Sequence, residues 1–217
     1  MDAPLLTVAI PTYNRSALLD LCLSQMTPQV AAHGDRVELL VSDNASSDDT
    51  AAVVARHQAE VPIRHIQNAE NIGPDANFAQ CLQKARGKYV LIFGDDDVLL
   101  DGTLDKLLPL LAEGNPGVVN LRGYAFREDF RAERPRKAPR RRVMRFRNPR
   151  AFAGKVNVMF TFISGNVINK SLLPEGFDVK PYLATQLVQL SWTFKAALGA
   201  KENVFVDDYL VAAKAEN

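Results

Sequence analysis

The sequence has little cysteine and no long apolar run. Its 217 residues include only Cys22 and Cys81, too few for a disulfide framework or a zinc site, so we expect a reducing, cytoplasmic environment. No window approaches the roughly 18 apolar residues of a membrane-spanning helix. The first four residues lack the basic stretch and apolar segment of a secretory signal. No Gly-x-Gly-x-x-Gly motif follows the first apolar run, which argues against a Rossmann-type dinucleotide enzyme.

Charge is distributed unevenly along the chain. The net charge is only +1, but residues 127–150, hereafter the basic segment, contain eleven Lys and Arg against three acids. Of the 26 basic and 25 acidic residues in the whole chain, 15 and 22 remain outside this segment, which gives the remainder a net charge of −7. An acidic body with one strongly basic segment indicates an anionic partner for that segment.

Strand and helix patterns alternate through the first half of the chain. Short apolar, β-branched runs predict strands at residues 6–10, 37–41, 63–67, 89–93 and 118–124. Amphipathic stretches between them predict helices that begin near Ser16, Ser46 and Pro74, and a further helix over 104–111. This alternation predicts an α/β fold with a mainly parallel sheet covered by helices on both faces.

The second half is less regular. The basic segment is rich in Arg and Pro and is expected to form a loop or a weakly ordered excursion. Beyond it, we expect a strand over 160–168, a helix through 183–194 that ends near Gly199, and a short strand at 204–206. The 47% hydrophobic content is enough for one core, so we expect a single domain. Within it we distinguish two halves, 1–125 and 126–217, because the second is less regular.

Three adjacent carboxylates follow the predicted strand at 89–93. Asp95, Asp96 and Asp97 repel one another unless a cation lies among them. Ligands of open α/β sheets bind beyond the carboxyl ends of the strands, where this triplet falls. Mg²⁺ and Mn²⁺ prefer carboxylate oxygens. The triplet therefore predicts a metal site, and the alternative is a solvated acidic turn that caps the next helix.

The first half resembles the family 2 glycosyltransferases, which have the GT-A fold. The resemblance covers residues 5–100 and rests on four pieces in order: VAIPTYNR at 8–15, ELLVSDNASSDDT at 38–50, Asn71-Ile72-Gly73, and GKYVLIFGDDD at 87–97. The Asn-Ile-Gly and Gly-Asp-Asp-Asp variants are most similar to the branch with abequosyltransferase-like surface-polysaccharide enzymes. Each piece is weak alone, whereas four in order are specific.

The resemblance implies roles for individual residues. The nucleotide would be bound by Pro11, Thr12, Asn14, Asp43, Asn71, Gly73 and Asp95, with Asp43 reading the base. The acidic triplet matches the Asp-X-Asp motif of the family, although Gly94 stands where the first Asp is usual. Asp96 and Asp97 would then bind Mn²⁺ or Mg²⁺, and Asp95 and Asp96 would act in catalysis. Asp43, Asn14 and Asn71 also have a simpler interpretation as turn formers.

The general base is harder to assign. Family members are generally inverting and use a carboxylate, often of a Glu-Asp pair, to deprotonate the acceptor hydroxyl. Here Thr185-Gln186 stands in the comparable stretch, and an amide is no base near neutral pH. We take Asp178 as the first candidate, followed by Asp207 and Asp208. A plain turn residue is the alternative for Asp178.

The function that the resemblance implies is the metal-dependent, inverting transfer of a hexosyl or deoxyhexosyl group. The donor would be a nucleoside-diphosphate sugar and the acceptor a saccharide or lipid-linked hydroxyl, in surface polysaccharide or glycan assembly. The alternative is a non-catalytic nucleotide-sugar-binding or assembly-partner protein.

Three interpretations of the basic segment remain open. It forms a solvated loop, it binds an anionic membrane at the inner face or a lipid-diphosphate acceptor, or, least favoured, it binds nucleic acid. In the membrane interpretation, Phe130, Met144, Phe146 and Phe152 would insert at the interface.

Overall fold

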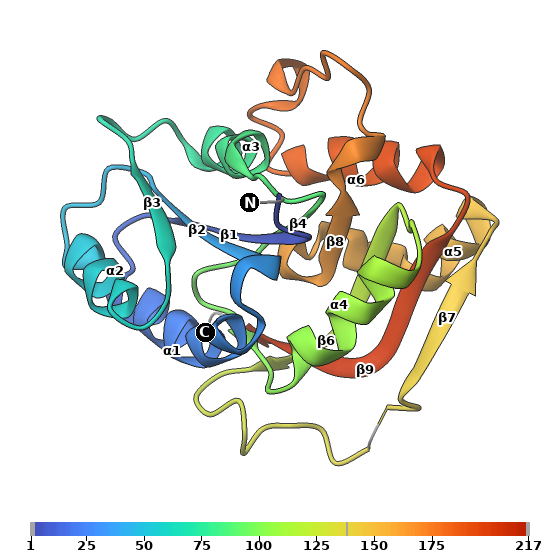
Figure 1. The fold of residues 1–217 in the computed structure, drawn as a ribbon, viewed down its shortest axis with the longest axis horizontal. Coiled ribbons are helices and arrows are strands. Elements are labelled where there is room, and N and C mark those ends of the chain that lie inside the picture. Colours follow the sequence, from blue (N-terminus) through green and yellow to red (C-terminus); the bar gives the residue numbers. More distant parts are fainter. Residues whose placement is uncertain (1–2, 138, 216–217) are drawn as a thin grey trace.

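One mixed sheet forms the centre of the molecule (Figure 1). The computed structural model describes residues 3–137 and 139–215, so the outermost ends of the two predicted halves lie outside it. Within the described residues the strand order is β3-β2-β1-β4-β8-β6-β9-β5, with β7 paired to β9. The strands are β1 (Leu6–Thr12), β2 (Val37–Asp43), β3 (Ile63–Gln67), β4 (Tyr89–Ile92), β5 (Val98–Leu99), β6 (Val118–Phe126), β7 (Arg142–Phe146), β8 (Asn166–Asn169) and β9 (Asn203–Lys214).

The predicted parallel arrangement is found in the first four strands of this order. β1 pairs in parallel with β2 and β4, and β2 pairs in parallel with β3. The register of β1 and β2 ends with Thr12 opposite Asp43, so the loops that follow these strands leave the sheet at one edge. The backbone N–H of Phe93 donates to the carbonyl of Ala9, which keeps the end of β4 beside β1. The motif residues of three strands therefore meet at this edge.

The remaining strands make the sheet mixed. β8 pairs antiparallel with both β4 and β6, while β6 and β9 are parallel. The short strand β5 and the outer strand β7 both run antiparallel to β9. Because strands of the second half pair with β4 and β5 of the first, one sheet runs through both halves, and the division at residue 125 falls inside β6.

Helices cover both faces of the sheet, as predicted. One core contains α1, α2 and α4 with one set of alternating strand residues, such as Val8 and Leu39. The other contains α3, α5 and α6 with the alternate set, such as Ala9 and Leu40. The helices are α1 (Ser16–His33), α2 (Thr50–Gln58), α3 (Pro74–Lys84), α4 (Thr103–Glu113), α5 (Pro149–Val156) and α6 (Val188–Gly199). None of the described helices is both long and apolar enough to cross a bilayer.

The second half departs from the sequence expectations in three places. The stretch 160–168 is mostly two 3₁₀ helices, η2 (Asn157–Thr161) and η3 (Ile163–Gly165), and β8 begins only at Asn166. The helix predicted from 183 begins at Val188, because Ala184 and Gln186 both have positive φ, which interrupts a helix. The strand expected at 204–206 extends over all of β9.

The basic segment is also more ordered than expected. Residues 127–141 form no helix or strand among those described, but β7 pairs with β9, and Arg150 belongs to α5. The expected insertion of aromatic residues in and next to this segment into a membrane is wrong for Phe130 and Phe152, which are 8% and 0% exposed. Phe152 packs against the rings of Phe146 and Phe160. Met144 and Phe146 are partly buried against the same core, so these side chains stabilise the interior.

Candidate functional site

A cavity of about 550 Å³ lies at the carboxyl ends of β1 and β4. Its walls come from the loops that follow these strands, from the start of α3, and from the turn between η2 and η3. The lining residues are Pro11, Thr12, Tyr13, Arg15, Asn44, Asn71, Pro74, Asn77, Phe78, Gly94, Asp95, Asp96, Asp97, Thr161, Phe162 and Ile163. The structure thus brings the acidic triplet together with Pro11, Thr12 and Asn71 of the predicted site residues, whereas Asn14, Asp43 and Gly73 do not line the cavity.

Arg15 supplies the positive charge beside the acidic triplet. Its Nη1 lies 3.2 Å from Oδ1 of Asp95 and 2.9 Å from Oδ2 of Asp96. Thr12 donates from Oγ1 to the other oxygen of Asp95 at 2.7 Å. Burial raises the pKa of Asp95, while the Thr12 hydroxyl and Arg15 oppose that rise. The sequence analysis assigned no role to Arg15, although it is the first cation after β1 and belongs to the VAIPTYNR piece.

Asp97 is buried, and both of its carboxylate oxygens accept hydrogen bonds. It is 5% exposed, its Oδ2 accepts from the hydroxyl of Ser164, and its Oδ1 accepts from the backbone N–H of Lys214 at 3.0 Å. The Ser164 oxygen in turn accepts from the N–H of Gly94 at 2.8 Å. Burial raises the pKa of Asp97 to about 7. These contacts fix the loop that carries the triplet.

Asp96 is the carboxylate most open to a ligand. Its side chain is 21% exposed, compared with 6% for Asp95. No group of three or more acidic, His or Cys side chains among the described residues is arranged to hold a metal ion by itself. Mg²⁺ typically takes one or two carboxylates together with substrate phosphates. The hard oxygen of Asp96 therefore fits a divalent cation that shares its coordination with a bound diphosphate, whereas both Asp97 oxygens already accept hydrogen bonds.

Asp43 has one free oxygen at the end of β2. The side chain is fully buried, and its Oδ1 accepts from the N–H of Ser46 at 2.9 Å, which is the turn-forming contact. Its Oδ2 has no hydrogen-bond partner among the described residues and lies 3.8 Å from Nε2 of His65, which also has none. A buried acceptor without a partner is rare and requires an explanation. Asp43 lies beside the cavity residue Asn44 but does not itself line the cavity.

Asn14 and Gly73 shape the loops around the cavity without lining it. Asn14 has φ 52°, and its Oδ1 accepts from the N–H of Ser47 at 2.8 Å, which ties the loop after β1 to the loop after β2. Gly73 has φ 84° immediately before α3, a conformation that favours glycine. The N–H of Gly73 donates to Oδ1 of Asn71 at 2.9 Å. Both residues position the loops of the site.

Asn44 is a site residue that the sequence analysis missed. It is 3% exposed, and its Oδ1 accepts from the Nδ2 of Asn68 and from the N–H of Ile72, both at 3.0 Å. Its Nδ2 donates to Oδ1 of Asn71 at 2.8 Å. Asn44 therefore holds the loop 68–73 against the end of β2. Its sequence signals are its place directly after Asp43 and its membership of the ELLVSDNASSDDT piece.

Asn44→Ala is expected to lower the free energy of unfolding by about 1–3 kcal/mol, because it removes three hydrogen bonds of the Asn44 side chain, each worth about 0.5–1.5 kcal/mol. Urea denaturation measures this loss, and hydrogen exchange at the Ile72 amide should become faster. Gln67→Ala is the matched control, since Gln67 is exposed at the end of β3. If both variants unfold at the same urea concentration as the parent, Asn44 does not organise this loop.

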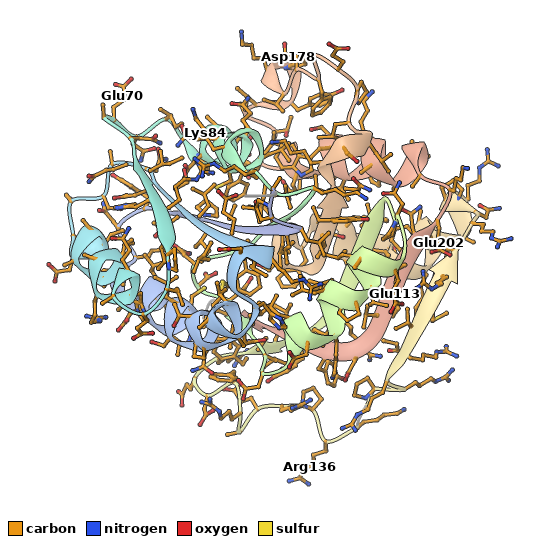
Figure 2. The ribbon with its side chains drawn as sticks, viewed as in Figure 1. Glu70, Lys84, Glu113, Arg136, Asp178 and Glu202 are labelled. Carbon is orange, nitrogen blue, oxygen red and sulfur yellow. The ribbon has the colours of Figure 1, made fainter. Side chains whose placement is uncertain are left out.

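The candidate bases lie outside the cavity. Asp178 is exposed, and its Oδ1 accepts from the N–H of Lys180 at 3.0 Å at the start of η5 (Lys180–Tyr182), which is the turn role. Figure 2 places it at the periphery, on the loop between β8 and α6. Asp207 pairs with Arg122, and Asp208 pairs with Lys106. The assignment of a general base remains a prediction.

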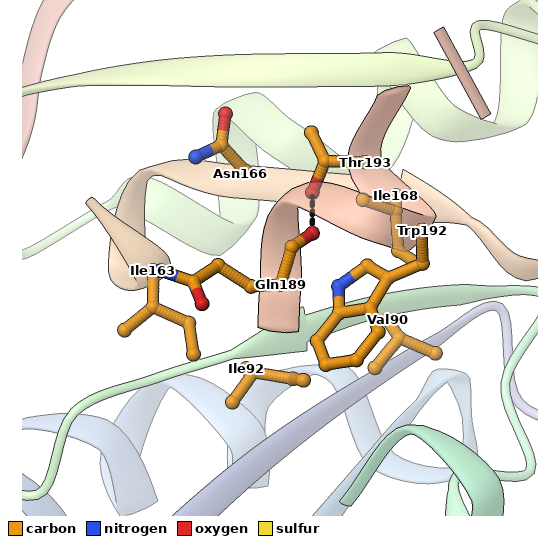
Figure 3. Close-up of a pocket in the computed structure, with 8 residues that line it drawn as sticks. All are labelled: Val90, Ile92, Ile163, Asn166, Ile168, Gln189, Trp192 and Thr193. Carbon is orange, nitrogen blue, oxygen red and sulfur yellow. Dashed lines mark hydrogen bonds between the residues drawn. The ribbon is translucent and has the colours of Figure 1, made fainter. Parts of the chain in front are cut away.

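Two other hollows are poorer candidates. One, of about 10 Å³, lies between β4, β8 and α6 and is lined by Val90, Ile168 and Trp192 among others (Figure 3); it has room for about one water molecule. The other, of about 830 Å³, lies at the amino ends of β2 and β3. Its central acid, Glu38, already pairs with Arg64 at 2.9 Å. The cavity that contains the acidic triplet is therefore the candidate site.

Known proteins share both the sequence motifs and the fold. The chain is 38% identical over 102 residues to "Abequosyltransferase RfbV" of Salmonella typhimurium, which covers 46% of this chain and 30% of that protein. It is 36% identical over 113 residues to "GalNAc(5)-diNAcBac-PP-undecaprenol beta-1,3-glucosyltransferase" of Campylobacter jejuni, covering 51% of this chain and 36% of that one. These matches span about a third of each relative.

Solved structures extend the likeness to nearly the whole chain. S. aureus TarS (residues 1–349) superposes with a TM-score of 0.75 at 20% identity, covering 96% of this chain and 60% of that one. The mannosyltransferase PcManGT from Pyrobaculum calidifontis, in complex with GDP-Man and Mn²⁺, gives 0.65 at 19% identity, with 99% and 57% covered. The fold is therefore of the GT-A type. Residues 7–177 match the sequence profile described as "Glycosyl transferase family 2", and the chain belongs to that family.

Proposed function

We propose that this protein transfers a sugar, hexosyl or deoxyhexosyl, from a nucleoside diphosphate to a hydroxyl acceptor, in surface polysaccharide or glycan assembly. The observation that carries this proposal is the acidic triplet at the end of β4, which lines a cavity of about 550 Å³ and in which the Asp96 side chain is partly exposed. The family membership supports glycosyl transfer in general. The relatives named for abequosyl and glucosyl transfer support a polysaccharide role.

Several polar groups in and beside the cavity have a role in this proposal. Asp96, with Asp97 as a second candidate, would hold Mn²⁺ or Mg²⁺, which when bound stabilises the charge that grows on the leaving diphosphate. Thr12 and Arg15 orient Asp95 toward the sugar or ribose. The unpartnered Oδ2 of Asp43 would accept an N–H of the base. Mn²⁺ in the PcManGT complex supports the cation.

The acceptor side of the proposal is less constrained. Transfer with inversion needs a base near the acceptor hydroxyl, and Asp178 could reach the cavity only if its loop moved. The C. jejuni relative is named for a lipid-linked acceptor, so a saccharide or lipid-linked hydroxyl is the proposed acceptor. Such an acceptor would be met at the cytoplasmic face of a membrane.

A non-catalytic nucleotide-sugar-binding protein is the second candidate. Thr185-Gln186 in place of the Glu-Asp pair favours it, as does the absence of Asp178, Asp207 and Asp208 from the residues that line the cavity. Incubation with UDP-, GDP- and CDP-sugars and a panel of acceptors separates the two. Release of nucleoside diphosphate with formation of glycosylated product supports the enzyme, and tight binding without release supports the second candidate.

A thermal-shift screen tests the nucleotide site itself. We expect UDP, GDP or CDP to raise the melting temperature in the presence of Mn²⁺, and less after EDTA. A ligand at about a hundred times its Kd stabilises the native state by about 2.7 kcal/mol. Asp43→Ala should reduce the shift, because the base would lose its acceptor. A melting temperature unchanged by all three diphosphates with Mn²⁺ would refute the nucleotide site.

A further inference from the structure

Large apolar side chains are exposed together on η2 and α6. Val158 and Met159 on η2 are 67% and 39% exposed, and Phe194 and Leu198 on α6 are 42% and 69% exposed. The ring of Phe194 lies 5.2 Å from that of Phe160, the buried residue next to Met159, so the two elements pack together. These four residues form a substantial part of the exposed apolar surface of the molecule.

Packing in the core does not account for the exposed apolar side chains of α6. The helix already buries its other side, with Val188, Trp192 and Ala196 in the second core. Phe194 and Leu198 are four residues apart and lie one turn above the other on the outer side. A helix that is apolar on both sides normally has a second partner, and contiguous exposed apolar patches mark interaction sites.

Basic residues outnumber acids on the elements that carry and adjoin this apolar surface. Residues 139–201 contain eleven Lys and Arg but only two acids, Glu175 and Asp178. Four of these bases lie on or beside α5 and α6 and have no carboxylate within 4 Å among the described residues: Arg147, Arg150, Lys155 and Lys195. In Figure 1, β7, α5 and α6 occupy the right-hand side, while α1 and α2 lie on the left.

We propose that this surface docks on an anionic lipid bilayer. The apolar–basic face consists of Val158, Met159, Phe194 and Leu198 with Arg147, Arg150, Lys155 and Lys195. Apolar side chains that enter the headgroup region and cations that pair with lipid phosphates are the two requirements of peripheral membrane binding. The inserting residues are thus different from the aromatics of the basic segment, which are buried or partly buried.

The charge of the face decides between a membrane and a second copy of the chain. In a two-fold symmetric dimer the same patch faces itself, so the basic residues of one copy would approach those of the other. An anionic bilayer instead complements all of them. The face also adjoins the site, because η2 continues directly into Thr161, Phe162 and Ile163 of the cavity wall. Docking would therefore bring the cavity close to the lipid surface.

Vesicle sedimentation tests the proposal. The protein should sediment with vesicles of phosphatidylcholine and phosphatidylglycerol, less with phosphatidylcholine alone, and less as salt is raised. The double variant Val158→Glu, Leu198→Glu should bind about tenfold or more weakly, since it replaces apolar contacts with repelled charges. Leu21→Glu on α1, at a site that is 37% exposed, is the matched control and should bind like the parent.

Three outcomes would overturn the proposal: no sedimentation of the parent with anionic vesicles, equal sedimentation of the double variant, or a lipid-free dimer that the double variant dissociates. Val158, Leu198 and Leu21 are all exposed, so the urea midpoints of the double variant and of the control should match that of the parent. If the double variant is destabilised, the variant Arg150→Glu, Lys195→Glu takes its place. Because the measurement is vesicle binding, its result is independent of sugar transfer.

Discussion

Asp96→Asn is expected to lower the rate of sugar transfer by about a hundred- to a thousandfold, the range seen when one charge-stabilising group is removed from an active site. Asp96 has the most exposed carboxylate of the triplet, and asparagine keeps its shape but removes the negative charge that a divalent cation requires. The variant should also lose most of the Mn²⁺-dependent part of the thermal shift with nucleoside diphosphates. Release of diphosphate from the sugar nucleotide measures the rate.

Asp101→Asn is the matched control for this experiment. Asp101 is exposed five residues further along, so the same change in charge there should leave the rate within a factor of about two. Asp96→Asn removes a carboxylate that is paired to Arg15, and its urea midpoint should show that the fold is retained. Normal turnover by Asp96→Asn would mean that the cation, if any, is held elsewhere.

Phe152→Ala is expected to lower the free energy of unfolding by about 3–5 kcal/mol, the usual cost of emptying a buried aromatic site. Phe152 is 0% exposed and packs between the rings of Phe146 and Phe160. Its removal leaves a cavity between α5, β7 and η2, which the neighbouring elements can fill only in part. Urea unfolding followed by tryptophan fluorescence should report this loss, since Trp192 belongs to the same core.

Val143→Ala provides the contrast within the basic segment. Val143 is 44% exposed on β7, so its truncation should cost less than about 1 kcal/mol. The two variants together separate the interior role of Phe152 from the membrane role that the sequence suggested. Equal, small effects for both would show that α5 is not packed as the structure has it.

The features of the fold and site that the sequence predicts are those determined by residues close together in the chain. The strands β1, β2 and β4 were predicted because parallel strands buried on both faces are short, mostly apolar runs, whereas β3 is only partly buried and mixes apolar with polar residues. The acidic triplet was predicted to lie in the site because it directly follows β4, and Pro11 and Thr12 because they end β1. In each case a few neighbouring residues determine both the strand and the position of its last side chain.

The rest depends on contacts between distant residues. The pairing of Arg15 with Asp95 and Asp96 joins residues about eighty apart, and the Asn44 contacts join two loops, so no local pattern indicates either. The pairing of β7 with β9 converts an Arg-rich stretch, which composition alone predicts to be a loop, into an outer strand. The late start of α6 depends on the positive φ of Ala184 and Gln186, which is unusual for these residue types.

The bond from the Lys214 amide to Asp97 has a consequence for biosynthesis. Asp97 is synthesised before its partner Lys214, which lies 117 positions later in the chain. The strand β5 likewise has no pairing strand until β9 has been made. A nascent chain therefore presents its acidic triplet on an incompletely braced loop until residue 214 has been made. Nucleotide binding should accordingly be acquired only after residue 214 has been made, as a single event that accompanies docking of β9.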